Sequence, residues 1–351
     1  MRAILLAGGK GTRLRPLTLH TPKPIVPIFD RPFLRYQIDL LRQVPEIDEI
    51  VLSLNYQPHR IEEVFGDGSD LGVHIRYVVE PTPLGTGGAI KFAAGEKLDQ
   101  PIVVFNGDVF TSVDLPAIIQ LHRDRHAKAT IVLTPVDNPT AYGLVETDPD
   151  GNVIDFLEKP SADEIRCDTI NAGIYVLEPE TLERIPRDTS FSIERGYFPS
   201  LIRNHETFIA HTYRGYWIDI GTPDKYQQAH RDIMDGHFVA PPFAGKAGTA
   251  VVSPEARIED GAIIEGPCFI DHDVVVKKGA RIGPHTVLGH HCHVDEDAVL
   301  EGAILWPHCW VDREARLTRT MAGRHAHFGR NADVGAAVLG DKSVVTDYSK
   351  T

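Results

Sequence analysis

The stretch LLAGGKGTRLRPLTLHTPKP, residues 5–24, continues an apolar strand candidate into three glycines mixed with arginine, lysine and proline. A dinucleotide-binding turn requires Gly-x-Gly-x-x-Gly, but Arg13 and Leu14 occupy the places where the last glycine is needed. A P-loop requires Gly-x-x-x-x-Gly-Lys before Ser or Thr, and this pattern is also absent. What remains is a strand followed by a glycine turn, whose backbone N–H groups can converge on an anion. The stretch therefore predicts an α/β domain that binds a phosphate-bearing ligand.

Positive charge is concentrated at this end of the chain. Residues 1–29 include Arg2, Lys10, Arg13, Arg15 and Lys23 and contain no acidic residue, whereas the whole chain has a formal net charge of −13. A cationic cluster in an acidic protein indicates a small, strongly anionic ligand, and a solvated basic surface is the alternative. The negative total argues against broad binding of nucleic acid, which needs a basic face to displace counterions.

Composition bounds the class of protein. The 351 residues suffice for two domains, and 42% hydrophobic with 24% charged residues is typical of a soluble protein. No apolar run reaches the roughly 18–20 residues that span a bilayer, and the short run Ala3–Ala7 lacks the length of a signal peptide. We therefore expect a cytoplasmic protein with no membrane partner. The four cysteines show no paired spacing, which disfavours a disulfide framework or a zinc motif.

Up to about residue 235, short runs rich in Val and Ile alternate with amphipathic stretches. Helices are expected to begin at Pro32 and near Pro116. The predicted strands are Ala3–Ala7, Glu49–Leu54, His74–Val79, Ile102–Phe105, Thr130–Val136 and Ile174–Leu177. This alternation implies a mostly parallel sheet covered on both faces, with ligands at the carboxyl ends of its strands.

From about residue 250 the period changes to six. The recurring apolar residues are Val252, Ile258, Ile264, Ile270, Val276, Ile282, Leu288, Val294, Leu300 and Trp306. A small residue precedes most of them by two places, which predicts a β-solenoid that buries one aliphatic side chain per repeat. After Trp306 the step shortens to five at Val311, which indicates a one-residue deletion at a corner or the start of a cap. Beyond about Gly323 we expect an irregular tail.

Two residue types in this ladder invite chemical interpretations. Cys268 and Cys292 occupy the small inward positions, so we interpret them as filler. A histidine cluster invites a metal hypothesis, but residues around an inward Val294 must point to different faces of the coil. We therefore expect solvated corner histidines at His285, His290, His291 and His293.

The glycine-rich stretch includes GTRLRPLT and TPKPIVP, and further motifs follow in order: PLGTGGA (83–89), FNGD (105–108), YGLV (142–145), EKP (158–160), NAGIYVL (171–177) and GYWIDIGTP (215–223). Together they resemble the sugar-1-phosphate nucleotidyltransferases, also called nucleotide-sugar pyrophosphorylases. The resemblance covers nearly the whole first half. It implies a Rossmann-like catalytic domain over residues 1–235, a linker over 236–250, and a left-handed parallel β-helix of hexapeptide repeats over 251–351 that includes the irregular tail.

The reaction implied by the resemblance is a displacement at phosphorus. A phosphate oxygen of the sugar 1-phosphate attacks the α-phosphorus of a nucleoside triphosphate, and pyrophosphate leaves. Mg²⁺ is the expected cofactor because it neutralises two polyanions with few carboxylate ligands. Asp108 follows an apolar strand and is the first candidate ligand, with a turn cap as the alternative. Asp219, an acid within an apolar run, is the second, with a structural salt bridge as the alternative.

The resemblance also assigns the binding residues. Asp108, Asp219, Arg13 and Lys23 are expected to be catalytic, the last two by holding the triphosphate, and Lys159 is expected to hold the sugar phosphate. The expected nucleotide-binding residues are Leu6, Ala7, Gly8, Gly9, Gly11, Thr12, Arg13, Lys23, Glu80, Pro83, Gly85, Thr86, Asn106 and Gly107. The expected sugar-phosphate-binding residues are Gly143, Glu158, Lys159, Asn171 and Gly173. Glu158 suits vicinal hydroxyls because a carboxylate accepts two hydrogen bonds; an ion pair with Lys159 or a solvent-facing position is the alternative.

TPKPIVP and FSIERGYFPSLI (191–202) look most like the mannose-1-phosphate guanylyltransferases that carry a hexapeptide tail. Two departures from that pattern leave the identity of the base and the sugar undecided. Position 87 is glycine where alanine is common, and SIERG replaces an SIEKE-like form. The alternatives are a related thymidylyl-, uridylyl-, adenylyl- or guanylyltransferase, a bifunctional enzyme with acyltransferase activity in the β-helix, and a non-catalytic sugar-nucleotide sensor. A homo-oligomer is expected because solenoid faces commonly mediate subunit contact.

Overall fold

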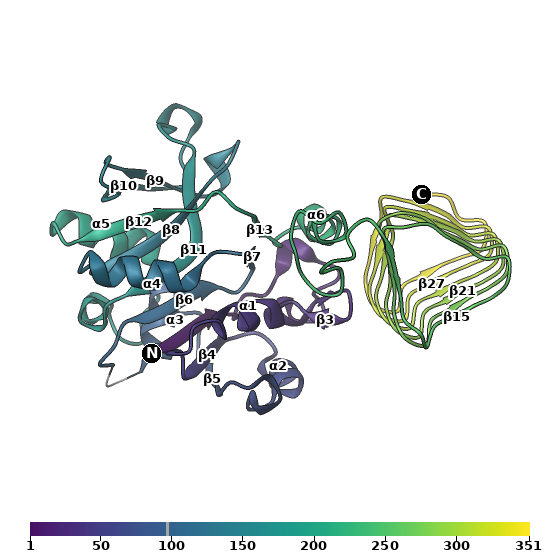
Figure 1. The fold of residues 1–351 in the computed structure, drawn as a ribbon, viewed down its shortest axis with the longest axis horizontal. Helices are drawn as coiled ribbons and strands as arrows, with labels where there is room; N and C mark the ends of the chain where they lie inside the picture. The colour runs from purple at the N-terminus through teal and green to yellow at the C-terminus, as the bar shows by residue number, and fades with distance from the viewer. Residues whose placement is uncertain (96–97) are drawn as a thin grey trace. The chain divides into compact units, whose positions relative to one another are not determined.

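The computed structural model describes residues 1–95 and 98–351. The chain forms two compact units that do not follow the sequence order. The first unit comprises Met1–Lys10 and Leu34–Asp219, and the second comprises Gly11–Phe33 and Ile220–Thr351. The polypeptide therefore passes from one unit to the other three times. Figure 1 shows the strands and helices that build each unit.

The described part of the first unit is built on a nine-stranded mixed sheet with the order β10-β9-β11-β6-β1-β4-β5, and β8 and β12 extend from β11. Its strands are β1 (Arg2–Leu6), β4 (Glu49–Leu54), β5 (Ile75–Val79), β6 (Ile102–Asn106), β8 (Ala129–Pro135), β9 (Gly143–Thr147), β10 (Val153–Glu158), β11 (Thr169–Leu177) and β12 (Phe208–Thr212). All six strands predicted from the sequence are present. The parallel part is β6-β1-β4-β5, while β11 runs antiparallel to β6, so the sheet is mixed beyond that edge.

The helices of the first unit are α1 (Leu34–Leu41), α2 (Pro58–Phe65), α3 (Gly85–Ala94), α4 (Leu115–Asp124) and α5 (Phe198–Arg203). The helix expected to begin at Pro32 is present as α1 but begins at Leu34, because Pro32 belongs to the strand β3 (Arg31–Pro32). The helix expected near Pro116 is confirmed as α4. Helix α4 begins there because the Asp114 side chain accepts a hydrogen bond from the Ala117 amide at 3.1 Å and Pro116 needs no donor in the first turn. Buried aromatic rings join α5 to the sheet, with Phe198 stacked on Phe208 at 5.1 Å between centroids.

Strands of the second unit stack as a parallel β-helix, visible in Figure 1 as repeated coils coloured green to yellow. One face contains β14 (Ala250–Val252), β17 (Cys268–Ile270), β20 (Thr286–Leu288), β23 (Ile304–Leu305), β26 (Met321–Ala322) and β29 (Val338–Leu339). The next contains β15 (Arg257–Ile258), β18 (Val275–Val276), β21 (His293–Val294), β24 (Trp310–Val311), β27 (His327–Phe328) and β30 (Val344–Val345). The third contains β16 (Ile263–Ile264), β19 (Arg281–Ile282), β22 (Val299–Glu301), β25 (Arg316–Thr318) and β28 (Asp333–Gly335). The arrangement is consistent with the predicted left-handed type.

The inward ladder is confirmed from Ile258 to Leu300, Val252 at its start is exposed, and the remainder needs two corrections. Leu288 pairs with Leu305, so Leu305 takes the inward place that the sequence pattern gave to Trp306. The one-residue deletion thus falls between Leu300 and Leu305, at the corner that contains Gly302. The predicted irregular tail is also wrong, because β26 to β30 continue the coils to Val345. Each later coil has the same shortened corner, so its inward residues do not follow a constant step of six. A search for a constant step therefore missed these coils.

The buried cysteines fill the space between coils, as predicted. Cys268, Cys292 and Cys309 lie in the β-helix core among alanines. Burial raises the pKa of the Cys268 thiol to about 11, so the side chain stays protonated at neutral pH.

The segment Gly11–Phe33 packs within the second unit. It contains the 3₁₀ turns Thr12–Leu14 and Lys23–Ile25 and a small hairpin, β2 (Pro27–Ile28) with β3 (Arg31–Pro32). Phe29 contacts His230 of α6 (Pro223–Met234), Phe243 and Phe269, with centroid separations of 4.9, 5.1 and 5.3 Å. Helix α6 also donates a hydrogen bond from the Tyr226 hydroxyl to the Pro27 carbonyl. The basic segment is therefore held by aromatic side chains that come more than 190 residues later.

Among the described residues, no helix has the length and apolar character needed to cross a membrane.

Candidate active site

The carboxyl ends of β1 and β6 meet at Gly107. The Gly107 amide donates to the Leu6 carbonyl at 3.0 Å, and a Cβ at Gly107 would lie 2.5 Å from that oxygen. Only glycine allows the two backbones to approach this closely. Leu6, Ala7 and Gly107 are thereby fixed beside one another at the edge where ligands of parallel sheets bind.

Asp219 ends a strand of a two-stranded sheet, and Asp108 lies in the turn just before the other strand. β7 (Val109–Thr111) directly follows Asp108 and pairs antiparallel with β13 (Trp217–Asp219), which places Asp219 opposite Val109. Asp219 is buried, and the Tyr142 hydroxyl donates to its Oδ2 at 2.8 Å. Gln37 of α1 donates to the carbonyls of Asn106 and Val109, which holds the turn around Asp108. The pairing brings together two carboxylates that are 111 residues apart in the sequence.

Glu80 supports the loop after β1. The Ser53 hydroxyl donates to its Oε1 at 3.2 Å, and the Leu84 amide donates to its Oε2 at 3.0 Å. A Cβ at Gly8 would lie 3.3 Å from the same Oε1, so the glycine turn lies directly against this carboxylate. Both oxygens of Glu80 accept hydrogen bonds from the protein. The carboxylate is therefore held in place between the Gly8 turn and Leu84.

The N-terminus of α3 is covered by the segment Phe191–Glu194. The Gly87 and Gly88 amides both donate to the Phe191 carbonyl, at 2.8 and 3.1 Å. Thr86 Oγ1 donates to Glu194 Oε2 at 2.7 Å. Two of the helix N-terminal amides are therefore occupied within the protein. Gly85 and Thr86, both predicted for the nucleotide, lie at the first turn of this helix.

The predicted sugar-binding residues meet where β9 pairs with β10. Gly143 is the register partner of Glu158, and a Cβ on Gly143 would lie 3.1 Å from Glu158 Oε2. Lys159 is exposed, and its amide donates to the Tyr142 carbonyl at 2.9 Å. The pKa of Glu158 is raised above its ordinary value by burial and by the Glu194 carboxylate, and Lys159 lowers it. Glu158 is thus a half-buried acceptor between a carboxylate and a cation.

A bulge in β11 brings in the remaining polar candidates. The register of β11 on β8 shifts between Asn171 and Tyr175. Asn171 accepts a hydrogen bond from the Gly173 amide at 2.9 Å and donates to the Tyr175 hydroxyl at 2.8 Å. Gly173 has φ +75°, and a Cβ there would lie 2.7 Å from Asn106 Nδ2. The bulge therefore packs Asn171 and Asn106 against the same glycine.

The basic candidates Arg13 and Lys23 belong to the second unit. Lys23 is buried in its 3₁₀ turn, and its Cβ lies 3.2 Å from where a Cβ on Gly11 would be. Thr18 Oγ1 donates to the Gly11 carbonyl at 2.7 Å, which closes the loop on itself. Arg13 is exposed, as are its neighbours Thr12 and Lys10. The segment Gly11–Phe33 thus presents the buried Lys23 and the exposed Arg13 and Arg15 on a short, internally bonded loop.

Sequence reasoning missed three residues of this region. Glu194 bonds Thr86 and acts electrostatically on Glu158, while Tyr142 and Ser53 position Asp219 and Glu80. Glu194 and Tyr142 lie within the quoted motifs SIERG and YGLV, so the signal was present but carried no assigned role. No comparable signal marks Ser53, a buried polar residue inside the apolar strand β4.

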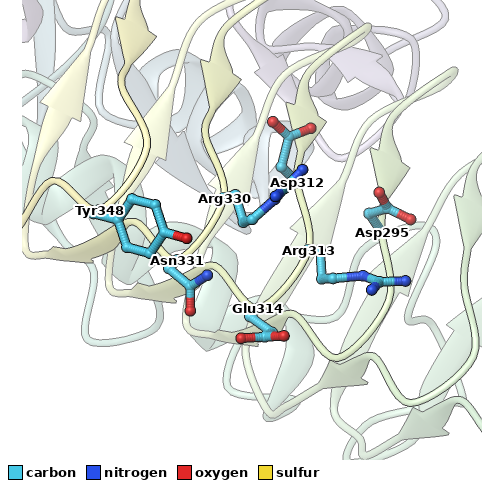
Figure 2. Close-up of a pocket in the computed structure, with 7 residues that line it drawn as sticks. All are labelled: Asp295, Asp312, Arg313, Glu314, Arg330, Asn331 and Tyr348. Carbon is cyan, nitrogen blue, oxygen red and sulfur yellow. The ribbon is translucent and has the colours of Figure 1, made fainter.

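A separate hollow lies on the β-helix and contains none of the predicted residues. It has a volume of about 590 Å³ and is lined by Asp295, Asp312, Arg313, Glu314, Arg330, Asn331 and Tyr348. In Figure 2 these side chains, drawn as sticks, come from successive coils.

Comparison with known proteins identifies the family of the chain. The family model described as nucleotidyl transferase matches residues 2–236, and that described as the GMPPB C-terminal domain matches residues 264–349. Mannose-1-phosphate guanylyltransferase of Mycobacterium tuberculosis is 38% identical over 86% of this chain and 82% of its own length. UTP–glucose-1-phosphate uridylyltransferase of Synechocystis is 32% identical over 97% and 92%. Mannose-1-phosphate guanylyltransferase 1 of Arabidopsis thaliana is 32% identical over 99% and 93%.

Solved structures give the same result for the catalytic part. A crystal structure of HddC from Yersinia pseudotuberculosis is 31% identical, with a TM-score of 0.57 over 66% of this chain and 99% of that one. The same protein complexed with GMP-PN gives 32% identity and a TM-score of 0.55. The chain belongs to the nucleotidyl transferase family and joins that catalytic part to a C-terminal β-helix.

Proposed function

We propose that this protein transfers a guanylyl group from GTP to mannose 1-phosphate and forms GDP-mannose and pyrophosphate. The observation that supports the reaction class is the pairing of β7 with β13, in which Asp219 is opposite Val109, the residue that follows Asp108. Relatives named as mannose-1-phosphate guanylyltransferases support the substrate pair. The uridylyltransferase of Synechocystis, similar over nearly the whole chain, makes UTP and glucose 1-phosphate the second candidate pair.

The proposed chemistry requires no enzyme nucleophile. A phosphate oxygen of the sugar 1-phosphate forms a bond to the α-phosphorus, and the bond from that phosphorus to the bridging oxygen breaks. The electron pair leaves with pyrophosphate. Because both reactants are polyanions, catalysis depends on in-line positioning and charge neutralisation.

Asp108 and Asp219 fit a divalent cation, which we propose to be Mg²⁺. Mg²⁺ binds through one or two carboxylates and phosphate oxygens, and it would neutralise charge that develops on the phosphates. Asp219 is buried with one oxygen oriented by Tyr142, as a preorganised ligand requires. This burial and hydrogen bond support Asp219 as a ligand of restricted orientation.

The remaining residues bind and orient. We assign the triphosphate to Lys23 and Arg13 and the sugar phosphate to the exposed Lys159. Glu158 accepts hydrogen bonds from sugar hydroxyls, and Gly143 leaves room beside its carboxylate. Thr86, whose hydroxyl is held by Glu194, lies at the nucleotide end of the same unit.

The test is a pyrophosphate-release assay with Mg²⁺ that crosses GTP, dTTP, UTP, ATP and CTP with four sugar 1-phosphates: mannose, glucose, galactose and N-acetylglucosamine. We expect the highest kcat/KM for GTP with mannose 1-phosphate, and no release by Asp108→Asn. Preference for UTP with glucose 1-phosphate would replace the substrate pair and keep the reaction class. Absence of release with every pair would refute the enzyme assignment and favour a sensor.

Two further assignments follow the same reasoning. We propose a cytoplasmic location, where nucleoside triphosphates are made, and a homo-oligomer formed through the β-helix. Light scattering after gel filtration tests the second, since a monomer at micromolar concentration would contradict it.

A further inference from the structure

Histidines gather at one corner of the β-helix. His290 and His291 lie on one coil, His272 on the coil before, and His308 and His325 on the two coils after. Backbone hydrogen bonds align the coils: the His291 amide donates to the His272 carbonyl at 3.2 Å, and the His308 amide to the His290 carbonyl at 3.0 Å. His285 and His293 do not join them, because His285 bonds Asp235 and His293 stacks on Trp310.

Three of these rings face a common point. Within the described residues, His272, His290 and His291 each offer one nitrogen, and the three nitrogens all lie within 4.8 Å of one another. The His272 and His290 rings are stacked with centroids 5.0 Å apart, and His291 is edge-on to both. His290 Nδ1 is buried and has no hydrogen-bond partner among the described residues. A buried polar atom without a partner is costly, and a metal ion would satisfy it.

The His272 and His291 rings each have a carboxylate beside one ring nitrogen. His272 Nδ1 lies 2.8 Å from Asp271 Oδ1, and His291 Nδ1 lies 3.7 Å from Asp273 Oδ2. A carboxylate on one ring nitrogen orients the imidazole and makes its other nitrogen a better ligand, as in known metal sites.

We propose that His272, His290 and His291 form a site for a divalent transition metal of the zinc class. Imidazole nitrogen is a preferred donor for Zn²⁺, Ni²⁺ and Cu²⁺ and a poor one for Mg²⁺. With Zn–N bonds of about 2.0–2.1 Å, tetrahedral ligands lie roughly 3.4 Å apart, which small side-chain rotations of the half-buried His272 and the exposed His291 provide. Water or His308, whose ring is 4.9 Å from that of His291, completes the coordination. The ion would cross-link two consecutive coils.

The test titrates the full-length protein with Zn²⁺ against a chromophoric chelator, in excess Mg²⁺ that occupies carboxylate sites. We expect one Zn²⁺ per chain, a higher Tm with Zn²⁺, and visible bands of tetrahedral Co²⁺ when cobalt replaces zinc. His290→Gln should weaken zinc binding at least about tenfold. His272→Gln, at a half-exposed position that tolerates substitution, should do the same if His290→Gln fails to fold.

His327→Gln is the matched control. His327 lies on the same β-helix, beside the Asp312 carboxylate at 3.0 Å, and outside the cluster. It should retain both affinity and stoichiometry. Equal zinc affinity in wild type, His290→Gln and His272→Gln would overturn the proposal, as would a protein that binds no Zn²⁺. Octahedral Co²⁺ bands would also contradict it, because they indicate oxygen ligands.

Discussion

Replacement of Gly107 by alanine tests whether the contact between β1 and β6 fixes the catalytic edge. The new Cβ would lie 2.5 Å from the Leu6 carbonyl oxygen and 3.1 Å from Ala7 Cα, and both neighbours are backbone atoms. To restore ordinary van der Waals contact, the strand ends must separate by roughly 0.5–0.9 Å. Overpacking of this kind costs about 1–3 kcal/mol, which lowers the Tm of a unit of this size by about 2–12 °C.

The same movement displaces Asp108 from the residues after β1. A misplacement approaching 1 Å costs on the order of 100-fold in rate, so we expect a loss of that size in kcat/KM for pyrophosphate release. Thermal unfolding followed by circular dichroism and steady-state kinetics measure the two effects separately.

Two other glycines serve as controls. Gly9→Ala places a Cβ with no described atom within 4 Å, so it should leave the Tm unchanged and raise the KM for the nucleotide, whose approach it hinders. Gly335→Ala, in the β-helix with its nearest atom at 3.8 Å, should change neither quantity. A Gly107→Ala enzyme with the Tm of the wild type and kcat/KM within about threefold of it would refute the reasoning.

Four further outcomes are expected. Lys159→Ala should raise the KM for the sugar 1-phosphate about 10- to 100-fold and leave that for the nucleotide nearly unchanged, because it removes one charge-assisted contact; equal losses for both substrates would remove the assignment. Asp219→Asn should lower kcat about 100-fold and increase the Mg²⁺ concentration needed for half-maximal rate, whereas an unchanged Mg²⁺ dependence would point to a purely structural salt bridge. Burial and Glu194 raise the pKa of Glu158, so its ionisation costs stability above that pKa and nothing once the pH falls below the ordinary value. Glu158→Gln should therefore raise the Tm near pH 8 but not near pH 4, while weakening sugar binding; a lower Tm at pH 8 would contradict the sign. Phe29→Ala should lower the free energy of unfolding of the second unit by about 3–5 kcal/mol in urea titrations, because a buried ring is lost, and a change below 1 kcal/mol would show that the aromatic cluster does not hold the segment.

The sequence was sufficient where the pattern was local. Strand–helix alternation predicted the four parallel strands β1, β4, β5 and β6 but missed β12, which pairs parallel with β8, and the step of six predicted the coils up to Leu300. The fixed step failed at Leu305 because the shortened corner at Gly302 moves the inward position by one residue, and a large apolar Trp306 stood in the expected place. Trp306 is also buried, and its Nε1 donates a hydrogen bond to the Tyr226 hydroxyl at 3.0 Å.

In the candidate site, too, local patterns were predictable from the sequence and contacts between distant residues were not. Asp108 was predicted because it follows an apolar strand, and the structure places it in a turn at the carboxyl end of β6. Tyr142 and Glu194 lay in quoted motifs, but their partners Asp219 and Thr86 are 77 and 108 residues away, so their bonding depends on tertiary contacts that no local pattern encodes. The packing of Gly11–Phe33 with the C-terminal residues was equally inaccessible, because Phe29, Phe243 and Phe269 share no common period.

That packing has a consequence for how the protein is made. Phe29 leaves the ribosome about 240 residues before Phe269, one of the rings that enclose it. At about 5–20 residues per second, the basic segment waits on the order of 10–50 s for its packing partners. During synthesis, the segment with Arg13 and Lys23 is among the earliest parts of the chain to emerge and among the last to reach its final conformation. The contact of Phe29 with Phe269 therefore cannot form until the first coil of the β-helix has been translated.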